Sequence, residues 1–462
     1  MIKETFNHVI EFLAEFFGKE EVWVFLFFVG VGAWIVYAFF DAVRIILRNF
    51  FLYAWPLILF FFLFGIFESF WLFVRQERFK RKEEYVLLEL RIPREVKKSP
   101  QAMEEVLMAV HALRNAPGTF KEKYLDGEIT RIFALELVSF GGEARFFIRM
   151  NAGMRGVVEA ALYSFYPDLE VREVEDYVGG LPKNQEELAH RRMKVWGTEM
   201  VLAREAAYPI RTYDRFENIA EEKQFDPIST FLEVLGKVPK DETVGVQLLL
   251  APAAADWRDG FKDFLEKLKT PTTIAVEEEG GSKEVTVARS PGHTDILKAV
   301  EENLSKPAFL TLVRIIHFMP ESAPKGPPAR GALGAFNQFT ALDLNNFKAN
   351  KPTATKTDPW VKPYVFPKTR LRYRQERLLW NYRMREVPPE TWAGKFITSH
   401  RYHSNFKSER FFMSVKGIAT VFHPPTAVVL TAPHLRRTES RRAGPPAGLA
   451  IFGEEEEIEK FQ

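Results

Sequence analysis

Few strings in this chain have the residue types and spacing that catalysis or ligand binding requires. A phosphate-binding loop needs a Gly-rich turn that ends in Gly-Lys-Ser/Thr after a strand, so that backbone N–H groups cradle the phosphates. The nearest string is Gly280-Gly281-Ser282-Lys283, which lies in a segment rich in Thr, Glu, Gly and Ser. Such a composition is typical of a surface linker. We therefore expect no nucleotide site in this chain.

Candidates for metal and covalent chemistry are equally few. His400 and His403 have an HxxH spacing that presents two imidazoles to a metal, but no carboxylate or cysteine flanks them in the pattern of a zinc site. The chain has no cysteine, which excludes disulfides, thiolate catalysis and Cys-based zinc sites. Fingerprints of serine hydrolases, zinc proteases and dinucleotide-binding folds are also absent from the sequence. We expect a protein that is not an enzyme and uses no cofactor or metal.

Two nearly uncharged apolar runs, at 22–40 and 50–74, are each long enough to cross a hydrocarbon core of roughly 30 Å as a helix. Neither resembles a cleaved signal peptide, which has one short apolar stretch after a basic start. We predict a two-helix transmembrane hairpin with a basic juxtamembrane segment over 22–82. Glu68 lies inside the second run; it is close enough to the basic exit to reach the interface, and a transport path is the alternative.

Lys and Arg residues in short flanks stay on the cytoplasmic side of a membrane. They are most frequent after the second run, where we assign membrane-interface and topology roles to Trp71, Arg75, Arg78, Lys80, Arg81 and Lys82. The pattern predicts a multi-pass protein of the inner (cytoplasmic) membrane with its soluble body in the cytoplasm, and an amphipathic interfacial helix over 1–21. The net charge of +2 gives no bias toward nucleic acid, so direct nucleic-acid binding stays open, and the basic cluster is better explained by anionic lipid.

The soluble body begins with a segment, 83–180, whose periodicities alternate between strand and helix. The expected order is βαββαβ, the ferredoxin-like arrangement in which two helices cover one face of an antiparallel sheet. The Gly pair in Phe140-Gly141-Gly142-Glu143 predicts a hairpin turn, and Asn151 predicts a helix cap. The expected elements are strand Tyr85–Ile92, helix Pro100–Leu113, strands Ile132–Ser139 and Ala144–Met150, helix Ala152–Phe165 and strand Leu169–Val174.

A second α+β module is predicted over 181–408, interrupted by a surface linker at 270–293. Its opening repeats that of the first module, which makes internal duplication a plausible reading. Arg370–Arg385 is dense in Arg, Tyr and Leu and is compatible with a strand or a helix. The expected elements are strand Trp196–Ala203, a helix near Pro227–Leu235, strand Thr243–Leu250, helices Trp257–Leu268 and Thr294–Leu304, strand Phe309–His317 and a helical stretch from Gly331 to Leu344.

The run at 132–177 resembles an uncharacterised bacterial family of membrane-anchored domains, often placed before the motor domain of conjugation-type, type IV secretion ATPases. The similarity returns in the C-terminal extension, 409–462, at Glu409–Ser414, Gly417–Pro425, Thr431–Pro433 and Pro445–Leu449. In the family this stretch leads into the ATPase core. Here the chain ends twelve residues after Ala450 in an acidic tail. The resemblance therefore implies a separate P-loop motor ATPase.

These observations predict a non-catalytic, membrane-anchored platform subunit of a type IV secretion-like apparatus that moves DNA or protein. Its expected partners are the lipid bilayer, the motor ATPase and further copies of itself as a homo-oligomer. The candidate docking residues are Glu454, Glu455, Glu456 and Glu457, although a solvated tail is the simpler reading. The alternatives are a stand-alone membrane-bound scaffold or sensor unrelated to secretion, and a cryptic hydrolase.

Overall fold

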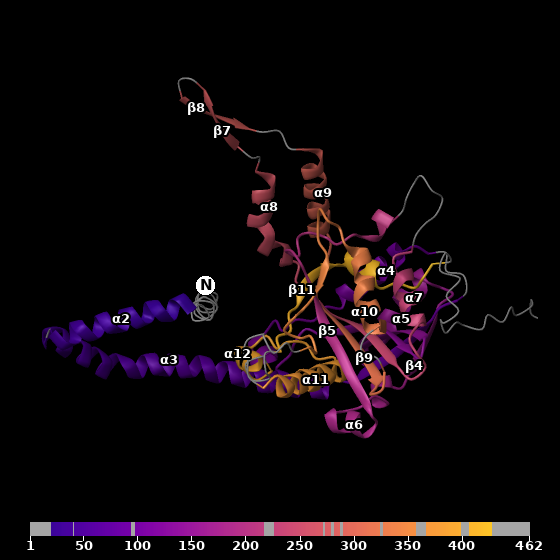
Figure 1. The fold of residues 1–462 in the computed structure, drawn as a ribbon, viewed down its shortest axis with the longest axis horizontal. Helices are drawn as coiled ribbons and strands as arrows, with labels where there is room; N and C mark the ends of the chain where they lie inside the picture. The colour runs from indigo at the N-terminus through magenta and orange to yellow at the C-terminus, as the bar shows by residue number, and fades with distance from the viewer. Residues whose placement is uncertain are drawn as a thin grey trace, which may run out of the picture. The chain divides into compact units, whose positions relative to one another are not determined.

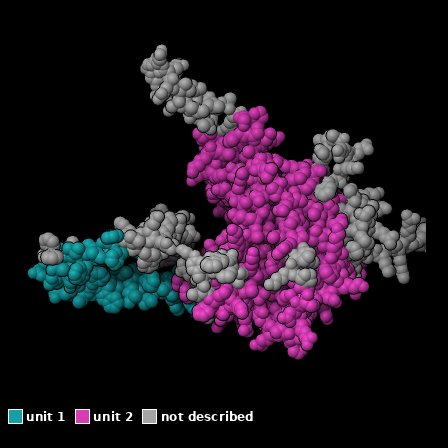
Figure 2. All heavy atoms as spheres, viewed as in Figure 1, with its two compact units in different colours: residues 1–70 teal, residues 71–462 magenta. Residues whose placement is uncertain are grey.

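The computed structural model describes residues 20–39, 41–93, 98–216, 226–270, 273–278, 281–286, 290–323, 327–356, 366–398 and 406–426. The chain divides into two compact units, residues 1–70 and 71–462, which Figure 2 colours separately. The predicted interfacial helix lies outside the described residues except for its last two, which begin helix α2. His400, His403 and the acidic tail Glu454–Glu457 also lie outside them.

The two apolar runs are helical. The first forms α2 (Glu20–Phe39), and the second lies within α3 (Asp41–Lys82), which begins in the first unit and ends in the second. Large apolar side chains remain exposed on α3, as at Phe60 and Phe61, where 60% and 63% of the surface is accessible. Among the described residues, one helix, within Val43–Lys82, is long and apolar enough to cross a membrane. A span of this kind is the normal reason for an exposed apolar surface of this length.

The second unit contains a nine-stranded sheet in which every pairing is antiparallel (Figure 1). Its path runs β10-β5-β9-β6-β2-β3-β1-β4, and β11 pairs with β9 beside this path. The fold is therefore of the mixed α and β kind. The strands are β1 (Tyr85–Arg91), β2 (Phe133–Phe140), β3 (Glu143–Asn151), β4 (Glu170–Val174), β5 (Met193–Leu202), β6 (Thr243–Pro252), β9 (Ala308–Pro320), β10 (Phe347–Ala349) and β11 (Phe411–Ser414).

The elements expected in 83–180 are confirmed, with helices α4 (Pro100–Ala112) and α5 (Arg155–Phe165) between the strands. The hairpin between β2 and β3 turns at Gly141 and Gly142, whose φ angles are +59° and +92°. Residues with a Cβ rarely adopt two such angles in succession, which is why a Gly pair marks this turn. Asn151 caps the following turn as predicted, because its side-chain oxygen accepts a hydrogen bond from Gly153 N at 2.9 Å.

Later elements agree less closely with the sequence-based expectation. Residues 270–293 were expected to form a linker, but β7 (Thr273–Glu278) and β8 (Gly281–Thr286) pair as a hairpin. Their β-branched residues favour extended pairing over a free linker. The hairpin follows α8 (Lys262–Lys269) and precedes α9 (Pro291–Ser305), and these two helices lie side by side in Figure 1. The other helices of this half are α7 (Ser229–Gly236), α10 (Pro327–Ala335), α11 (Pro367–Met384) and α12 (Trp392–Thr398).

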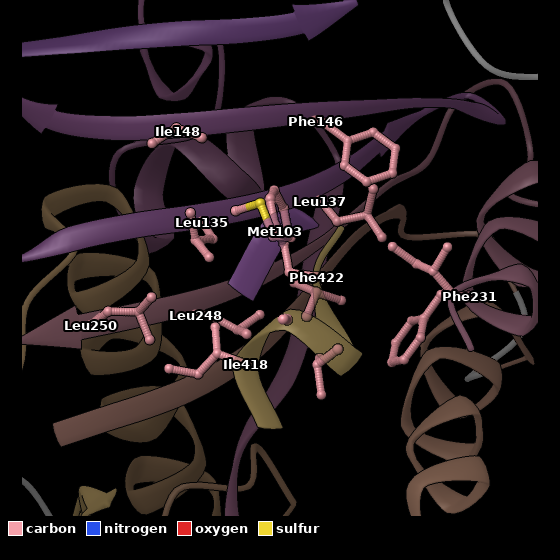
Figure 3. Close-up of a cluster of buried hydrophobic side chains, with 14 of the residues drawn as sticks. Met103, Leu135, Leu137, Phe146, Ile148, Phe231, Leu248, Leu250, Ile418 and Phe422 are labelled. Atoms are coloured by element: carbon pink, nitrogen blue, oxygen red, sulfur yellow. The ribbon is translucent and has the colours of Figure 1, made fainter. Parts of the chain in front are cut away.

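One apolar core covers a single face of the sheet and reaches both halves of it. Leu137, Phe146 and Ile148 on the strands and Val158 and Leu162 on α5 belong to this core, and all five are at most 3% exposed. The same cluster includes residues of α7 and of α13 (Val415–Val421), and Figure 3 shows several of them together. The expected boundaries at 180 and 408 therefore fall inside one compact unit.

The C-terminal segment is part of this core. Phe422 packs against Phe146 with ring centroids 5.6 Å apart, and Ile418 is fully buried (Figure 3). The described part of the C-terminal extension, β11 and α13, is mostly buried, because its apolar residues complete the core.

Candidate functional site

The face of the sheet opposite this core carries a row of polar side chains. Glu199 lies directly opposite Arg314, Arg314 opposite Gln247, and Gln247 opposite Glu136 on four successive strands. Residues paired directly across strands lie on the same face, so these four form one line across the sheet. All four are completely buried. Each therefore needs a partner, because an unpaired polar group in an apolar interior is costly.

Helix α11 covers this row. Its residues Leu378, Leu379 and Tyr382 are buried in a cluster on this face, so the segment that was compatible with strand or helix is a helix. Two glycines let it approach the strands closely. A Cβ atom at Gly245 would lie 2.1 Å from the Tyr382 hydroxyl, and one at Gly197 would lie 2.6 Å from Leu378 Cδ2. The glycines in β5 and β6 are thus explained by the approach of α11.

Arg385, directly after α11, is the centre of the charge network. Its guanidinium binds Glu136 through two contacts of 2.9 and 3.1 Å and Asp176 through two contacts of 2.6 and 2.8 Å. Gln247 Nε2 also donates to Glu136, at 2.9 Å. Burial alone would lower the pKa of Arg385, but Glu136, Tyr177 and Asp176 raise it well above its usual value. The backbone φ of Arg385 is +50°, the left-handed conformation that usually ends a helix at glycine.

Arg314 holds the end of α11 in a similar way. It binds Glu199 at 2.8 Å, and it also donates to the carbonyl oxygens of Asn381 and Glu386, both at 2.9 Å. The side chains of Arg314 and Glu199 have no accessible surface. Because these charges are fully desolvated, their geometry tolerates little movement. The network therefore fixes the end of α11 against the sheet.

A cavity of about 410 Å³ lies beside this network. Its walls are the last turns of α3, the first strands of the sheet, α11 and the end of α12. Its charged lining residues are Glu77, Lys80, Arg81, Glu83, Arg131, Arg149, Arg377, Arg385 and Glu386. Cations thus outnumber carboxylates on its walls, and we take this cavity as the candidate functional site.

Some of these cations are neutralised within the protein. Lys80 contacts both Glu77 and Glu386 at 2.7 Å, and Arg131 binds Glu83 at 2.9 Å. Burial alone would lower the pKa of Lys80, but the two carboxylates raise it. These pairs give the cavity a fixed rim.

Arg149 and Arg377 differ from them. Across the described ranges of the chain, neither guanidinium has a hydrogen bond or an ion pair, and Arg377 Nε is buried without a partner. Arg149 lies over the Tyr85 ring, 3.9 Å from its centroid. Burial and nearby Arg385 lower the pKa of Arg149, against the opposing effect of Tyr85, Asp176 and Glu136. Burial also lowers the pKa of Arg377, and carboxylates nearby, of which Glu386 has the largest effect, oppose this only in part. Since arginine keeps its proton in proteins, both side chains carry a charge that calls for an anion.

The predicted topology residues fall into two groups. Trp71 donates through Nε1 to the Tyr124 carbonyl at 2.7 Å, and Arg75 lies beside the indole ring. Lys80 is engaged in the ion pairs above. Arg78, Arg81 and Lys82 are exposed. The first group therefore builds the protein, and the second is available to a membrane surface.

Sequence reasoning missed Glu136, Arg149, Arg314, Arg377 and Arg385. A signal existed for part of this set. Glu136 and Arg314 each interrupt a strand that is otherwise strongly apolar, as in Leu135-Glu136-Leu137 and Val313-Arg314-Ile315. A lone charge in such a run indicates a buried polar partner. No comparable signal distinguished Arg149, Arg377 and Arg385 from surface arginines.

The shared motif around His423 is structural. His423 Nε2 lies 2.8 Å from Asp226 Oδ1, and Thr426 donates to the other oxygen of Asp226 through both N–H and O–H, at 2.6 and 2.8 Å. Burial alone would raise the pKa of Asp226, but His423, Thr426 and Ile228 bring it to about 2. The turn that contains His423 is thus tied to the loop before α7. No group of three potential metal ligands occurs among the residues that could be described.

Comparison with known protein families gives a match over more than half of the chain. The family model of a domain of unknown function, DUF8128, matches residues 74–347. The chain belongs to this family. The DUF8128 region runs from the last turns of α3 to β10 and so includes the lining residues Arg131 and Arg149. No curated protein matches the chain.

Proposed function

We propose that this DUF8128 protein is a non-catalytic, membrane-anchored platform subunit. The observation that carries the proposal is the way α3 ends. An apolar helix long enough to span a membrane terminates in turns that belong to the sheet unit. The Trp71–Tyr124 hydrogen bond and the Lys80–Glu386 ion pair tie those turns to distant parts of the chain. The last turns of α3 are thus fixed within the sheet unit.

The membrane assignment is multi-pass, with α2 as the second span and the soluble body on the cytoplasmic side. The support is the length of α2, since twenty helical residues reach about 30 Å, and the exposed Arg78, Arg81 and Lys82 after α3. A reporter active only outside the cytoplasm, fused after residue 82, tests this topology. We expect no activity; an active reporter would place the body on the other side.

We further propose that the sheet is a fusion of two ferredoxin-like modules. The first half of the sheet follows the path β4-β1-β3-β2, so its fourth strand in the chain lies beside its first, and its third lies between the first and the second. The strands of the second half, β10-β5-β9-β6, follow the same order. The halves meet through β2 and β6, where Glu136 faces Gln247. When the two halves are superposed strand by strand in this order, Glu89 in β1 takes the position of Glu199 in β5. A carboxylate at the same position of both halves supports an internal duplication.

Joining the modules in this way has a consequence for the sheet edges. The inner edges satisfy each other, and only β4 and the three-residue β10 remain as outer edges of the main path. Short or charged edge strands resist uncontrolled pairing. The second module differs from the first by an insertion between β6 and β9 that contains α8, the β7–β8 hairpin and α9. We propose that this insertion contacts the motor or further copies of the chain in a homo-oligomer.

The partner we propose is a separate P-loop motor ATPase of a type IV secretion-like apparatus, which the sequence resemblance supports. Co-purification of the full chain with an ATPase encoded next to it tests this, and the chain alone should neither bind nor hydrolyse ATP. If a chain that lacks residues 454–462 still co-purifies with the ATPase, the docking surface lies on the folded body and not on the acidic tail. ATP turnover by the purified chain would refute the platform role, and a chain that captures no ATPase would favour a stand-alone scaffold or sensor.

A further inference from the structure

We propose that the cavity between α3, the sheet and α11 binds a phosphate group carried by an anionic phospholipid or by a soluble phosphate ester. This proposal rests on the membrane anchoring proposed above for the choice of a lipid. The binding residues are Arg149 and Arg377, with Lys80 and Arg131 on the rim.

Charge is the first argument. Lys80, Arg131 and Arg385 each contact a carboxylate directly, whereas the partly buried Arg149 and Arg377 have no direct hydrogen bond or ion pair within the described part of the chain. Leaving a buried charge without a counter-ion is strongly unfavourable. Guanidinium groups fit phosphate oxygens through paired N–H donors. A phosphate in the cavity that both arginines line would give them the direct anionic partner that they lack among the described residues.

Size and rigidity give the second argument. A volume of about 410 Å³ lies within the range of small-molecule sites. Arg149 is held by the Tyr85 ring at 3.9 Å. Arg377 lies on α11, whose end is fixed by the buried Arg314 and Arg385 contacts. Donors that are held in place before binding lose little entropy on binding.

Position gives the third argument and favours the lipid. Phe73 lines the cavity and also closes the apolar run at 50–74, so the cavity wall begins where that run ends. Trp380, which lines the cavity, is 52% exposed, and Trp392 on α12 is 45% exposed. Exposed tryptophans near the end of a membrane helix are typical of the headgroup region. A headgroup could therefore enter from the bilayer surface.

The test uses the full chain in a neutral detergent and measures ligand-dependent thermal unfolding. The ligands are a short-chain phosphatidylglycerol, a matched short-chain phosphatidylcholine and glycerol 3-phosphate, all at constant ionic strength. The variants are Arg149→Gln, Arg377→Gln and their combination. Arg372→Gln is the matched control, since it removes one exposed arginine from α11 without touching the cavity.

We expect phosphatidylglycerol to stabilise the wild-type chain and the Arg372→Gln control. Each cavity variant should weaken the apparent affinity on the order of tenfold, as expected for the loss of a charge-assisted contact. Without ligand, the cavity variants should be at least as stable as wild type, because an unpaired charge has been removed. Stabilisation by glycerol 3-phosphate as well would assign a soluble phosphate ester as a ligand, and stabilisation by the lipid alone would assign the headgroup.

The proposal would be overturned if no phosphate compound stabilised the chain, or if the double variant bound phosphatidylglycerol as tightly as wild type. It would also be overturned if binding emerged only after deletion of 454–462, because the occupant would then be the chain's own carboxylates. Membrane fractionation separates this proposal from the platform role. The cavity variants should still sediment with membranes. A wild-type chain found in the soluble fraction would refute membrane anchoring, and phosphate binding would then be decided by the ligand titration alone.

Discussion

Replacing Arg385 with Ala removes the centre of the charge network under α11. The substitution deletes two contacts to Glu136 and two to Asp176. The two carboxylates respond differently, because the Asp176 side chain is 40% exposed and can be hydrated, while Glu136 has no accessible surface. The cost therefore arises mainly at Glu136.

Removing one partner of a buried ion pair typically costs 3–5 kcal/mol. Glu136 would retain the hydrogen bond from Gln247 at 2.9 Å, which compensates in part. We therefore expect Arg385→Ala to lower the free energy of unfolding by about 3 kcal/mol, the lower end of that range.

Two further variants separate charge from backbone strain. Arg385→Gly loses the same ion pairs but relieves the left-handed φ of +50°, so it should be more stable than Arg385→Ala by roughly 1 kcal/mol. In the Glu136→Gln background the Arg385→Ala substitution should cost much less, since no buried carboxylate is abandoned. The difference is the coupling energy of the pair.

The assay is denaturant or thermal unfolding of the full chain in detergent, because the shared core makes residues 71–462 one compact unit. Unfolding of Arg385→Ala within about 0.5 kcal/mol of wild type, the usual range of a surface substitution, would refute the reasoning. An equal loss in the wild-type and Glu136→Gln backgrounds would refute it as well, because the effect would then not arise from the pair.

Three other substitutions test the packing and the buried acid. Phe146→Ala should cost roughly 3–5 kcal/mol in the same assay, because the ring is 1% exposed; unchanged melting would remove it from the core. Gly245→Ala should cost roughly 1–3 kcal/mol through its clash with Tyr382, whereas Gly156→Ala in α5, with no atom within 4 Å, should be neutral or slightly stabilising; equal effects would contradict the close approach of α11. Asp226, whose pKa of about 2 lies below its ordinary 3.8, contributes stability that is present above that ordinary value and is lost as pH falls toward 2. Asp226→Asn should therefore lose about 2 kcal/mol near neutral pH and converge with wild type in acid; a constant difference down to the acid limit would contradict the shift.

Local pattern was sufficient for much of the first half of the sheet. The alternation in β1, β2 and β3, the Gly141-Gly142 turn and the Asn151 cap each depend on residues within a few positions of one another. The apolar stripe of α5 likewise indicated its buried face. Periodicity and turn chemistry act over such short ranges, which is why these elements were predictable.

The same reasoning was less successful where long-range contacts decide the structure. The helix at Arg370–Arg385 was not distinguished from a strand, because what makes it a helix is the sheet face that Leu378 and Tyr382 cover. Local pattern gave no indication of where 411–422 would pack: its strand pairs with β9, and Phe422 packs on Phe146.

The sequence by itself determined the apolar N-terminal helices, the absence of cysteine chemistry, and the strands and core of 83–180. The tertiary structure alone decided the candidate site. Arg385 and Glu136 are 249 residues apart, and Arg314 reaches Glu199 across 115. Such pairs are set by strand register and by the placement of α11, and neither leaves a periodic trace in the chain. The two unmatched arginines became visible only when the partners of their neighbours were known.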